Sequence, residues 1–224
     1  MSSKYNKDKD LEFMRYTDSE MLSILSKYIF SGKSEDTNTH QWDSIAGELQ
    51  HYGGNSIANF FRRTGVLYHE ILIDVCDELK VTTNKEKEAV DIEQDLLAHL
   101  FGNAWKEMSK ADKDSLKSEL GTPSVMKDCD AMNDIAKKIQ SGGKASYVIS
   151  GLTANATSQA ILGVGLSGAM ALPFLGLLSP IGMLFSAILG IKKLTGPNYK
   201  ITIPAVIQIA AMRQQMLNSD EVIF

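Results

Sequence analysis

The chain has 224 residues, of which 22% are charged, and its formal net charge is -4, as is typical of folded globular proteins. Two cysteines, Cys76 and Cys129, are too few for a disulfide-rich scaffold or a zinc site made of thiolates. Mild acidity disfavours binding to nucleic acid. The polar, charged start lacks the apolar core of a secretory signal, so we expect a cytoplasmic protein.

Charge is distributed unevenly along the chain. Residues 1–144 hold 19 Lys/Arg and 25 Asp/Glu, whereas residues 145–224 hold 4 and 2. No charged residue and no histidine occurs from Ala145 to Ile191. We therefore predict an acidic helical region over 1–144 and an apolar region over 145–224, joined at Gly142-Gly143, either as two domains or as parts of one.

In the acidic region, apolar residues recur every three or four positions and strand-like alternation is missing, which indicates an all-α, multi-helix bundle. Thr17 and Glu20 form a capping box at the start of the helix expected over 18–30, and Ser109 with Asp112 caps a short, polar one. Glycines end several of the helices. The helices are expected over 18–30, 42–52, 55–63, 66–79, 86–108, 109–121 and 124–140.

Three further local predictions concern helix ends and the core. Asp8 and Asp10 are expected to cap the first helix. Thr202 is expected to cap a C-terminal helix with Pro204 in its first turn, where a missing N–H costs little. Cys76 falls on the apolar face of 66–79 and is expected to be a core residue rather than a nucleophile.

Histidine pairs offer the main candidates for acid–base chemistry at neutral pH. Glu48 and His51 share one helix face, as do Asp95 and His99. A di-metal carboxylate centre needs two Glu-x-x-His motifs and two further glutamates, and one such motif occurs here. We therefore expect no metal, no cofactor and no enzymatic activity.

A surface for a protein partner is predicted between residues 40 and 80. Two basic residues stand beside aromatic ones there, but in an acidic chain such a pair does not indicate a nucleic-acid site. The residues of this predicted surface are Glu48, His51, Arg62, Arg63 and Tyr68.

A long uncharged run predicts a central, Gly-rich, apolar helical hairpin. Residues 160–191 are interrupted by Pro173 and by Ser179-Pro180, so two helices are expected to meet between Leu172 and Pro180. In each arm, small residues at four-residue spacing would let two helix backbones approach closely, as in a glycine zipper. They are Gly163, Ser167 and Ala171 in the first arm and Gly182, Ser186 and Gly190 in the second.

Two settings for this hairpin remain open. Lysines flank both ends and the turn is uncharged, as expected when both ends share one side of a membrane. Its 32 residues are nevertheless short for two spanning helices of about 20 residues each. The hairpin either contacts or enters the bacterial inner membrane, or is the buried core of a soluble bundle. Its small-residue faces also suit pairing between copies of the chain.

Four segments carry a family resemblance. They are Asp8-x-Asp10-Leu11-x-Phe13 and the runs IAGELQHYGGNSIAN (45–59), GVLYHEILIDVCDELK (65–80) and YKITIPAVIQIAAMR (199–213). Together they resemble the YaaW family of bacterial proteins of unknown function. The run 65–80 is also similar to the helical domain of ubiquinol–cytochrome c chaperones, assembly factors that bind a client protein and catalyse nothing.

Two functions follow from these observations. The first is a non-enzymatic protein whose apolar hairpin interacts with membrane lipid. The second is an assembly-chaperone-like adaptor that binds a client protein and keeps the hairpin in its core.

Overall fold

The computed structural model describes residues 5–30, 41–53, 65–165 and 199–221. Every regular element in these ranges is a helix and none is a strand, which confirms the all-α class. Within the described ranges, a short 3-10 helix, η1, precedes eight α-helices. Their bounds are η1 Glu12–Tyr16, α1 Ser19–Ile29, α2 Trp42–Gly53, α3 Tyr68–Glu78, α4 Ala89–Glu107, α5 Lys110–Glu119, α6 Asp128–Gln140, α7 Gly143–Leu162 and α9 Tyr199–Glu221.

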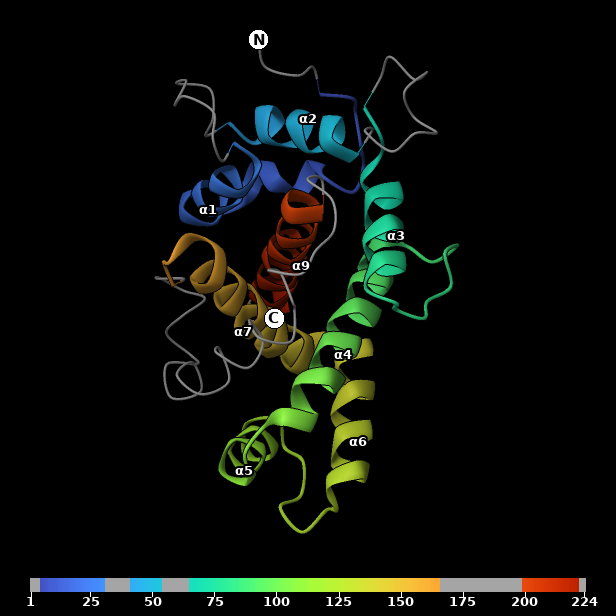
Figure 1. The fold of residues 1–224 in the computed structure, drawn as a ribbon, viewed down its shortest axis with the longest axis vertical. Helices are drawn as coiled ribbons and strands as arrows, with labels where there is room; N and C mark the ends of the chain where they lie inside the picture. The colour runs from blue at the N-terminus through green and yellow to red at the C-terminus, as the bar shows by residue number, and fades with distance from the viewer. Residues whose placement is uncertain (1–4, 31–40, 54–64, 166–198, 222–224) are drawn as a thin grey trace.

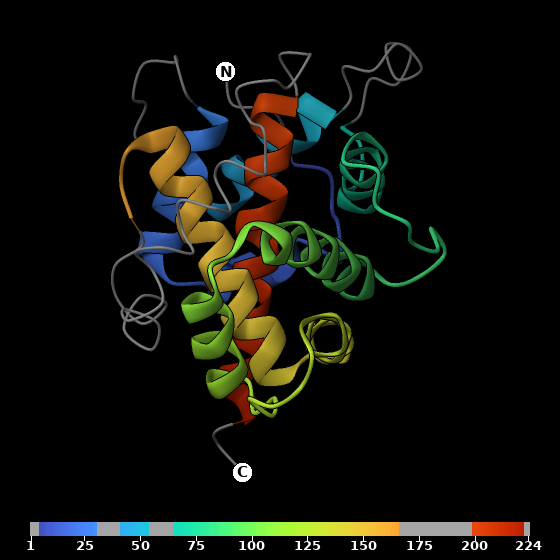
Figure 2. The same ribbon diagram turned by 60° about the horizontal axis from the view of Figure 1, so that its bottom comes forward.

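The long helices α7 and α9 form the centre of the fold. They pack side by side and run in opposite directions (Figure 2). Helix α9 also contacts α1, α2, α3 and α4, whereas α6 packs against α4 and α7. Helix α5 lies at the end of the molecule away from α1 and α2 (Figure 1). One hydrophobic core therefore takes residues from both predicted regions, 1–144 and 145–224.

Helix α7 is buried along most of its length although it is rich in hydroxyl groups. Thr153 Oγ1 donates to the carbonyl of Ile149 at 2.7 Å, and Thr157 Oγ1 donates to the carbonyl of Thr153 at 2.8 Å. A hydroxyl that bonds to the preceding turn of its own helix brings no unpaired polar group into the core. The polar part of the uncharged run, residues 145–158, is therefore a core helix.

Helix α7 ends at Leu162, inside the segment predicted as the first arm of the hairpin. Gly163 takes the left-handed conformation, with φ 69°, and its N–H donates to the carbonyl of Gln159 at 3.1 Å. Glycine adopts this conformation at little steric cost, so it ends the helix there. The prediction of an uninterrupted helix from Ala160 to about Leu172 is therefore wrong at Gly163.

Helix α9 begins at Tyr199, three residues before the predicted cap at Thr202. Pro204 consequently lies inside the helix rather than in its first turn. Proline there removes the N–H that would bond to the carbonyl of Lys200. Because Lys200 is exposed, water can replace that hydrogen bond, and the helix continues to Glu221.

The apolar face of α3 explains the behaviour of Cys76. Cys76 is buried as predicted, together with Ile71 and Leu72 on the same face; Leu67 precedes the helix, which begins at Tyr68, and is 41% exposed. Burial raises the pKa of the Cys76 thiol to about 12. The thiol is therefore protonated at neutral pH and serves as an apolar core group.

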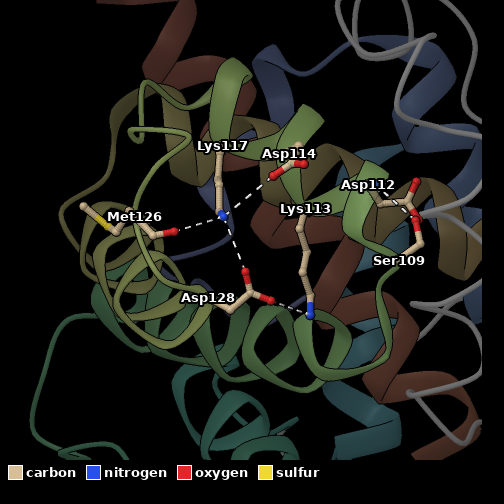
Figure 3. A network of polar contacts seen from close by, with 7 residues as sticks. All are labelled: Ser109, Asp112, Lys113, Asp114, Lys117, Met126 and Asp128. Carbon is tan, nitrogen blue, oxygen red and sulfur yellow. Dashed lines mark hydrogen bonds and ion pairs between the residues drawn. The ribbon is translucent and has the colours of Figure 1, made fainter.

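Charged side chains join α5 to the loop before α6 (Figure 3). Ser109 Oγ accepts the N–H of Asp112 at 3.2 Å, which confirms the predicted cap. The buried ammonium group of Lys117 donates to the carbonyl of Met126 at 3.2 Å and pairs with Asp128 at 3.4 Å. Few apolar residues of α5 are buried, so these polar contacts hold it in place.

One predicted cap at the N-terminal end is wrong. Asp18, rather than Thr17, caps α1, because Asp18 Oδ1 accepts the N–H of Glu20 at 2.8 Å. The helices predicted over 42–52 and 86–108 are confirmed within three residues at each end. The helix predicted over 55–63 lies outside the described residues.

Two glycine substitutions are predicted to act in opposite directions. A Cβ at Gly163 or Gly102 would meet no atom within 4 Å, so backbone conformation alone decides the effect. Gly163→Ala should lower the free energy of unfolding by about 1 kcal/mol because alanine disfavours a left-handed φ. Gly102→Ala, within α4, should raise it by about 0.5 to 1 kcal/mol because alanine favours the helix. Urea unfolding measures both; equal effects of the two changes would contradict the assigned end of α7.

Candidate functional site

A buried ion pair joins α4 to α9. Arg213 Nε donates to Glu93 Oε2 at 2.9 Å; the Glu93 side chain is fully buried and that of Arg213 is 12% exposed. The other carboxylate oxygen, Glu93 Oε1, accepts the phenol of Tyr68 at 2.7 Å. Both oxygens therefore have partners, as an ionised group in a protein interior requires.

Arg213 also holds the N-terminal segment. Its Nη2 donates to the carbonyl of Asp10 at 2.7 Å, and its guanidinium carbon lies 4.3 Å from the centre of the Phe13 ring. Burial alone would lower the pKa of Arg213, but the attraction of the Glu93 carboxylate, its hydrogen bond and the smaller effects of Tyr68 and Asp10 together outweigh burial and raise the pKa. Arg213 is therefore a permanently charged link between α9, α4 and the segment before η1.

Asp8 forms a second buried junction. Its Oδ2 accepts the N–H of Tyr68, the first residue of α3, at 2.6 Å, and its Oδ1 accepts the N–H of Asp10 at 3.0 Å. The Gln50 side chain in α2 reaches the same segment, donating to the carbonyl of Asn6 and accepting its N–H, both at 2.9 Å. Asp8 therefore caps α3 and not the first helix, because a carboxylate is favourable at any helix N-terminus that packing brings to it.

The residues of these two junctions form one polar cluster, which consists of Asp8, Gln50, Tyr68, Glu93 and Arg213. Burial raises the pKa of Tyr68 well above its ordinary value, and the nearby Glu93 carboxylate raises it further. The phenol is therefore a permanent donor. Because the carboxylate of Glu93 and the ring of Tyr68 are closed to solvent, this geometry suits a structural junction between helices.

Loss of Arg213 is predicted to be costly because it leaves the Glu93 carboxylate buried without a cation. Arg213→Met should lower the free energy of unfolding by about 3 to 5 kcal/mol. The double variant Glu93→Gln/Arg213→Met removes both charges and keeps an acceptor for Tyr68. Its free energy of unfolding should therefore fall less than that of Arg213→Met alone. Urea unfolding of the set gives the coupling energy. Strictly additive losses would contradict the assigned ion pair.

Two residues of the predicted partner surface are not on the surface. Glu48 is 3% exposed and Tyr68 is 0% exposed, because they lie on the inner faces of α2 and α3. His51 is exposed, so its role as a partner contact stays a prediction, and Arg62 and Arg63 lie outside the described residues. Across the described ranges, no group of three or more His, Cys, Asp or Glu side chains is placed to hold a metal ion.

The pairing of Asp95 with His99 is not formed. Asp95 instead accepts hydrogen bonds from Lys87, Thr83 and Gln140, each at 2.7 Å. Burial by itself raises the pKa of Asp95, but these bonds outweigh it and lower the pKa. The carboxylate thus ties the loop before α4 to the end of α6, and burial lowers the pKa of His99 so that its ring is neutral.

Most of the predicted hairpin lies outside the described residues. Gly163 ends α7 rather than contributing to a small-residue face. The other small residues and both turn prolines lie outside the described residues, so that part of the hairpin stays a prediction. These residues are Ser167, Ala171, Pro173, Pro180, Gly182, Ser186 and Gly190. In the part of the chain that the structure describes, no helix is long and apolar enough to cross a bilayer.

A surface groove of about 610 Å³ opens between the turn after η1 and the last turns of α9. The exposed ring of Tyr16 and the side chains of Met212 and Met216 give it an apolar lining, and Asp18 contributes a carboxylate. No local sequence pattern indicates this groove, because its two sides lie almost 200 residues apart in the chain. The remaining lining residues are Thr17, Gln215 and Ser219.

The polar cluster did leave a signal in the sequence. Arg213 is the sole charged residue between Lys200 and Asp220, and Glu93 falls among the apolar positions of its helix. A lone charge in an apolar helix indicates a buried, paired group. Periodicity gives no means of matching these two charges, since their partners lie far apart along the chain.

Comparisons with known proteins place the chain among bacterial relatives. It is 33% identical to a UPF0174 protein of Helicobacter pylori (strain J99) over 97% of its own length and 95% of the relative's. It is also 33% identical to the UPF0174 protein YaaW of Escherichia coli (strain K12), over 96% and 98% of the two lengths. A UPF0174 protein of Helicobacter pylori (strain 26695) is 39% identical over 77% of this chain and 87% of the relative.

A family model also matches part of the chain. It is described as ubiquinol-cytochrome C chaperone and covers residues 38–134. Both resemblances predicted from the sequence are therefore confirmed. No solved structure matches the chain significantly.

Proposed function

The chain belongs to the UPF0174 family, and on that premise we propose that it is a non-enzymatic adaptor of the assembly-chaperone type that binds a client protein. The observation that carries the proposal is the match to the ubiquinol-cytochrome C chaperone model over residues 38–134. That segment contains α2, α3, α4, α5 and the first half of α6. A chaperone acts through a binding surface, so the expected activity is formation of a protein complex.

The fold supports this proposal in one respect. The ionisable groups of the polar cluster form hydrogen bonds that hold helices together, and Asp95 is hydrogen-bonded within the protein in the same way. Exposed side chains on a rigid frame are then the groups available to a partner. The frame is suited to binding without a large change of shape.

The adaptor role predicts a client complex that survives without lipid. The tagged full chain, purified from its bacterial host in detergent-free buffer, should carry one partner in stoichiometric amount through gel filtration. Reconstitution from the two purified proteins should give a Kd of about 1 μM or lower, the range expected of a specific complex. An unrelated acidic helical protein with the same tag is the control. Failure to recover a partner, or loss of the partner when lipid is removed, would contradict the adaptor role.

A second candidate function rests on the uncharged residues that follow α7. Because α7 ends at Leu162, residues 164–191 provide 28 residues for any membrane contact. A helix needs about 17 to 20 apolar residues to span a bilayer, so these cannot make two spanning arms. The membrane candidate is therefore contact of residues 164–191 with the inner membrane, without two spanning arms.

Flotation with anionic liposomes tests the membrane candidate. If residues 164–191 contact lipid, the purified chain should float with the vesicles, and Leu175→Lys should reduce the floated fraction several-fold, because a charge in the bilayer is unfavourable. Leu217→Lys, the same change at an exposed residue of α9, is the matched control and should float like the unchanged chain. Dye release separates permeabilisation from anchoring, and a chain that stays at the bottom of the gradient rejects this function.

A further inference from the structure

The groove beside the C-terminal half of α9 has the composition of a protein-binding site. Tyr16 is 77% exposed and Met216 is half-buried, so these two side chains provide the apolar surface of the groove, whereas Met212 is buried behind it. Exposed aromatic residues and methionine are enriched at protein interfaces, the first as rigid anchors and the second because its side chain adapts to different shapes.

The two sides of the groove are fixed before any partner arrives. Arg213 follows Met212 directly in α9, and its guanidinium donates to the carbonyl of Asp10, just before η1. The same guanidinium lies against the ring of Phe13 within η1. These contacts set η1, and with it Tyr16, against α9. Binding to a preorganised surface avoids the entropic cost of ordering it.

The charge of the groove indicates which partner it fits. Its lining holds one carboxylate, that of Asp18, and no cation; the neighbouring Arg15, 5.9 Å from the centre of the Tyr16 ring, is paired with Glu12. Asp18 Oδ1 accepts the N–H of Glu20, and no hydrogen bond to Oδ2 is formed among the described residues. The N-terminal end of α1 at Asp18 carries a partial positive charge, which the partial negative charge at the nearby C-terminal end of α9 opposes, so the Asp18 carboxylate sets the sign of the groove. An apolar segment with a lysine or arginine complements this surface.

Resting on the adaptor role above, we propose that this groove binds the client through a basic amphipathic segment, whose apolar side chains lie on Tyr16 and Met216 while a cation pairs with Asp18. A cavity of about 610 Å³ falls within the usual range for binding pockets, roughly 300 to 1,000 Å³. The groove is built from residues outside the family-model segment 38–134. Its part in client binding can therefore be tested separately from that segment.

A pair of labelled peptides tests the chemistry of the groove. One is a 14-residue leucine/lysine amphipathic helix, and the other has glutamate in place of every lysine. Fluorescence anisotropy with the full chain should show saturable binding of the lysine peptide and none of the glutamate peptide. Tyr16→Ala and Asp18→Asn should each weaken binding at least tenfold; asparagine retains the cap of α1. Val125→Ala removes an apolar side chain that is 92% exposed elsewhere, and should leave binding unchanged.

Three outcomes decide the proposal. The assignment of the groove as the binding site is wrong if all variants bind the peptide equally, or if Val125→Ala weakens binding as much as Tyr16→Ala. It is also wrong if the glutamate peptide binds. A client complex that Tyr16→Ala leaves intact and His51→Asp weakens also overturns it, while the adaptor role stands. If no client complex forms at all, the adaptor role fails and with it the assignment of a client to the groove. Circular dichroism melting confirms that each variant is folded.

Discussion

The buried ion pair between Glu93 and Arg213 is the constraint on which the arrangement of the helices depends. Charges leave water at a large cost, and a pair in the core persists when its geometry is good and its remaining hydrogen bonds are made. Tyr68 donates a hydrogen bond to the second oxygen of the carboxylate, and the carbonyl of Asp10 accepts one from the guanidinium. Four segments, α3, α4, α9 and the chain before η1, are thereby fixed relative to one another.

This constraint links the core to the surface proposed for binding. The bond from Arg213 to the carbonyl of Asp10 brings η1 against α9, and the groove lies between these two elements. Asp8 extends the same junction to the first turn of α3, inside the segment shared with ubiquinol-cytochrome C chaperones. Changes in the polar cluster should therefore disturb binding indirectly, whereas Tyr16 and Asp18 lie outside it and can be changed without breaking it.

The uncharged run 145–191 contains residues with different structural roles. The hydroxyl groups of Thr153 and Thr157 in α7 bond to carbonyls of the preceding turn, so both residues are accommodated in the core. Gly163 then ends the helix where the small-residue pattern predicts continuation. A pattern of small residues fixes which helix faces can approach closely, but it does not distinguish a packing glycine from a terminating one.

The sequence by itself determined the all-α class, most helix positions, the Ser109 cap and the apolar face that buries Cys76, because periodicity and capping act over a few residues. It also identified the family. The tertiary structure alone decided which distant groups meet: Asp8 caps a helix 60 residues away, and Glu93 pairs across 120 residues. It likewise placed Glu48 and Tyr68 inside, and brought η1 to α9 to form the groove. Such pairings depend on how whole helices pack, a property that local spacing does not contain.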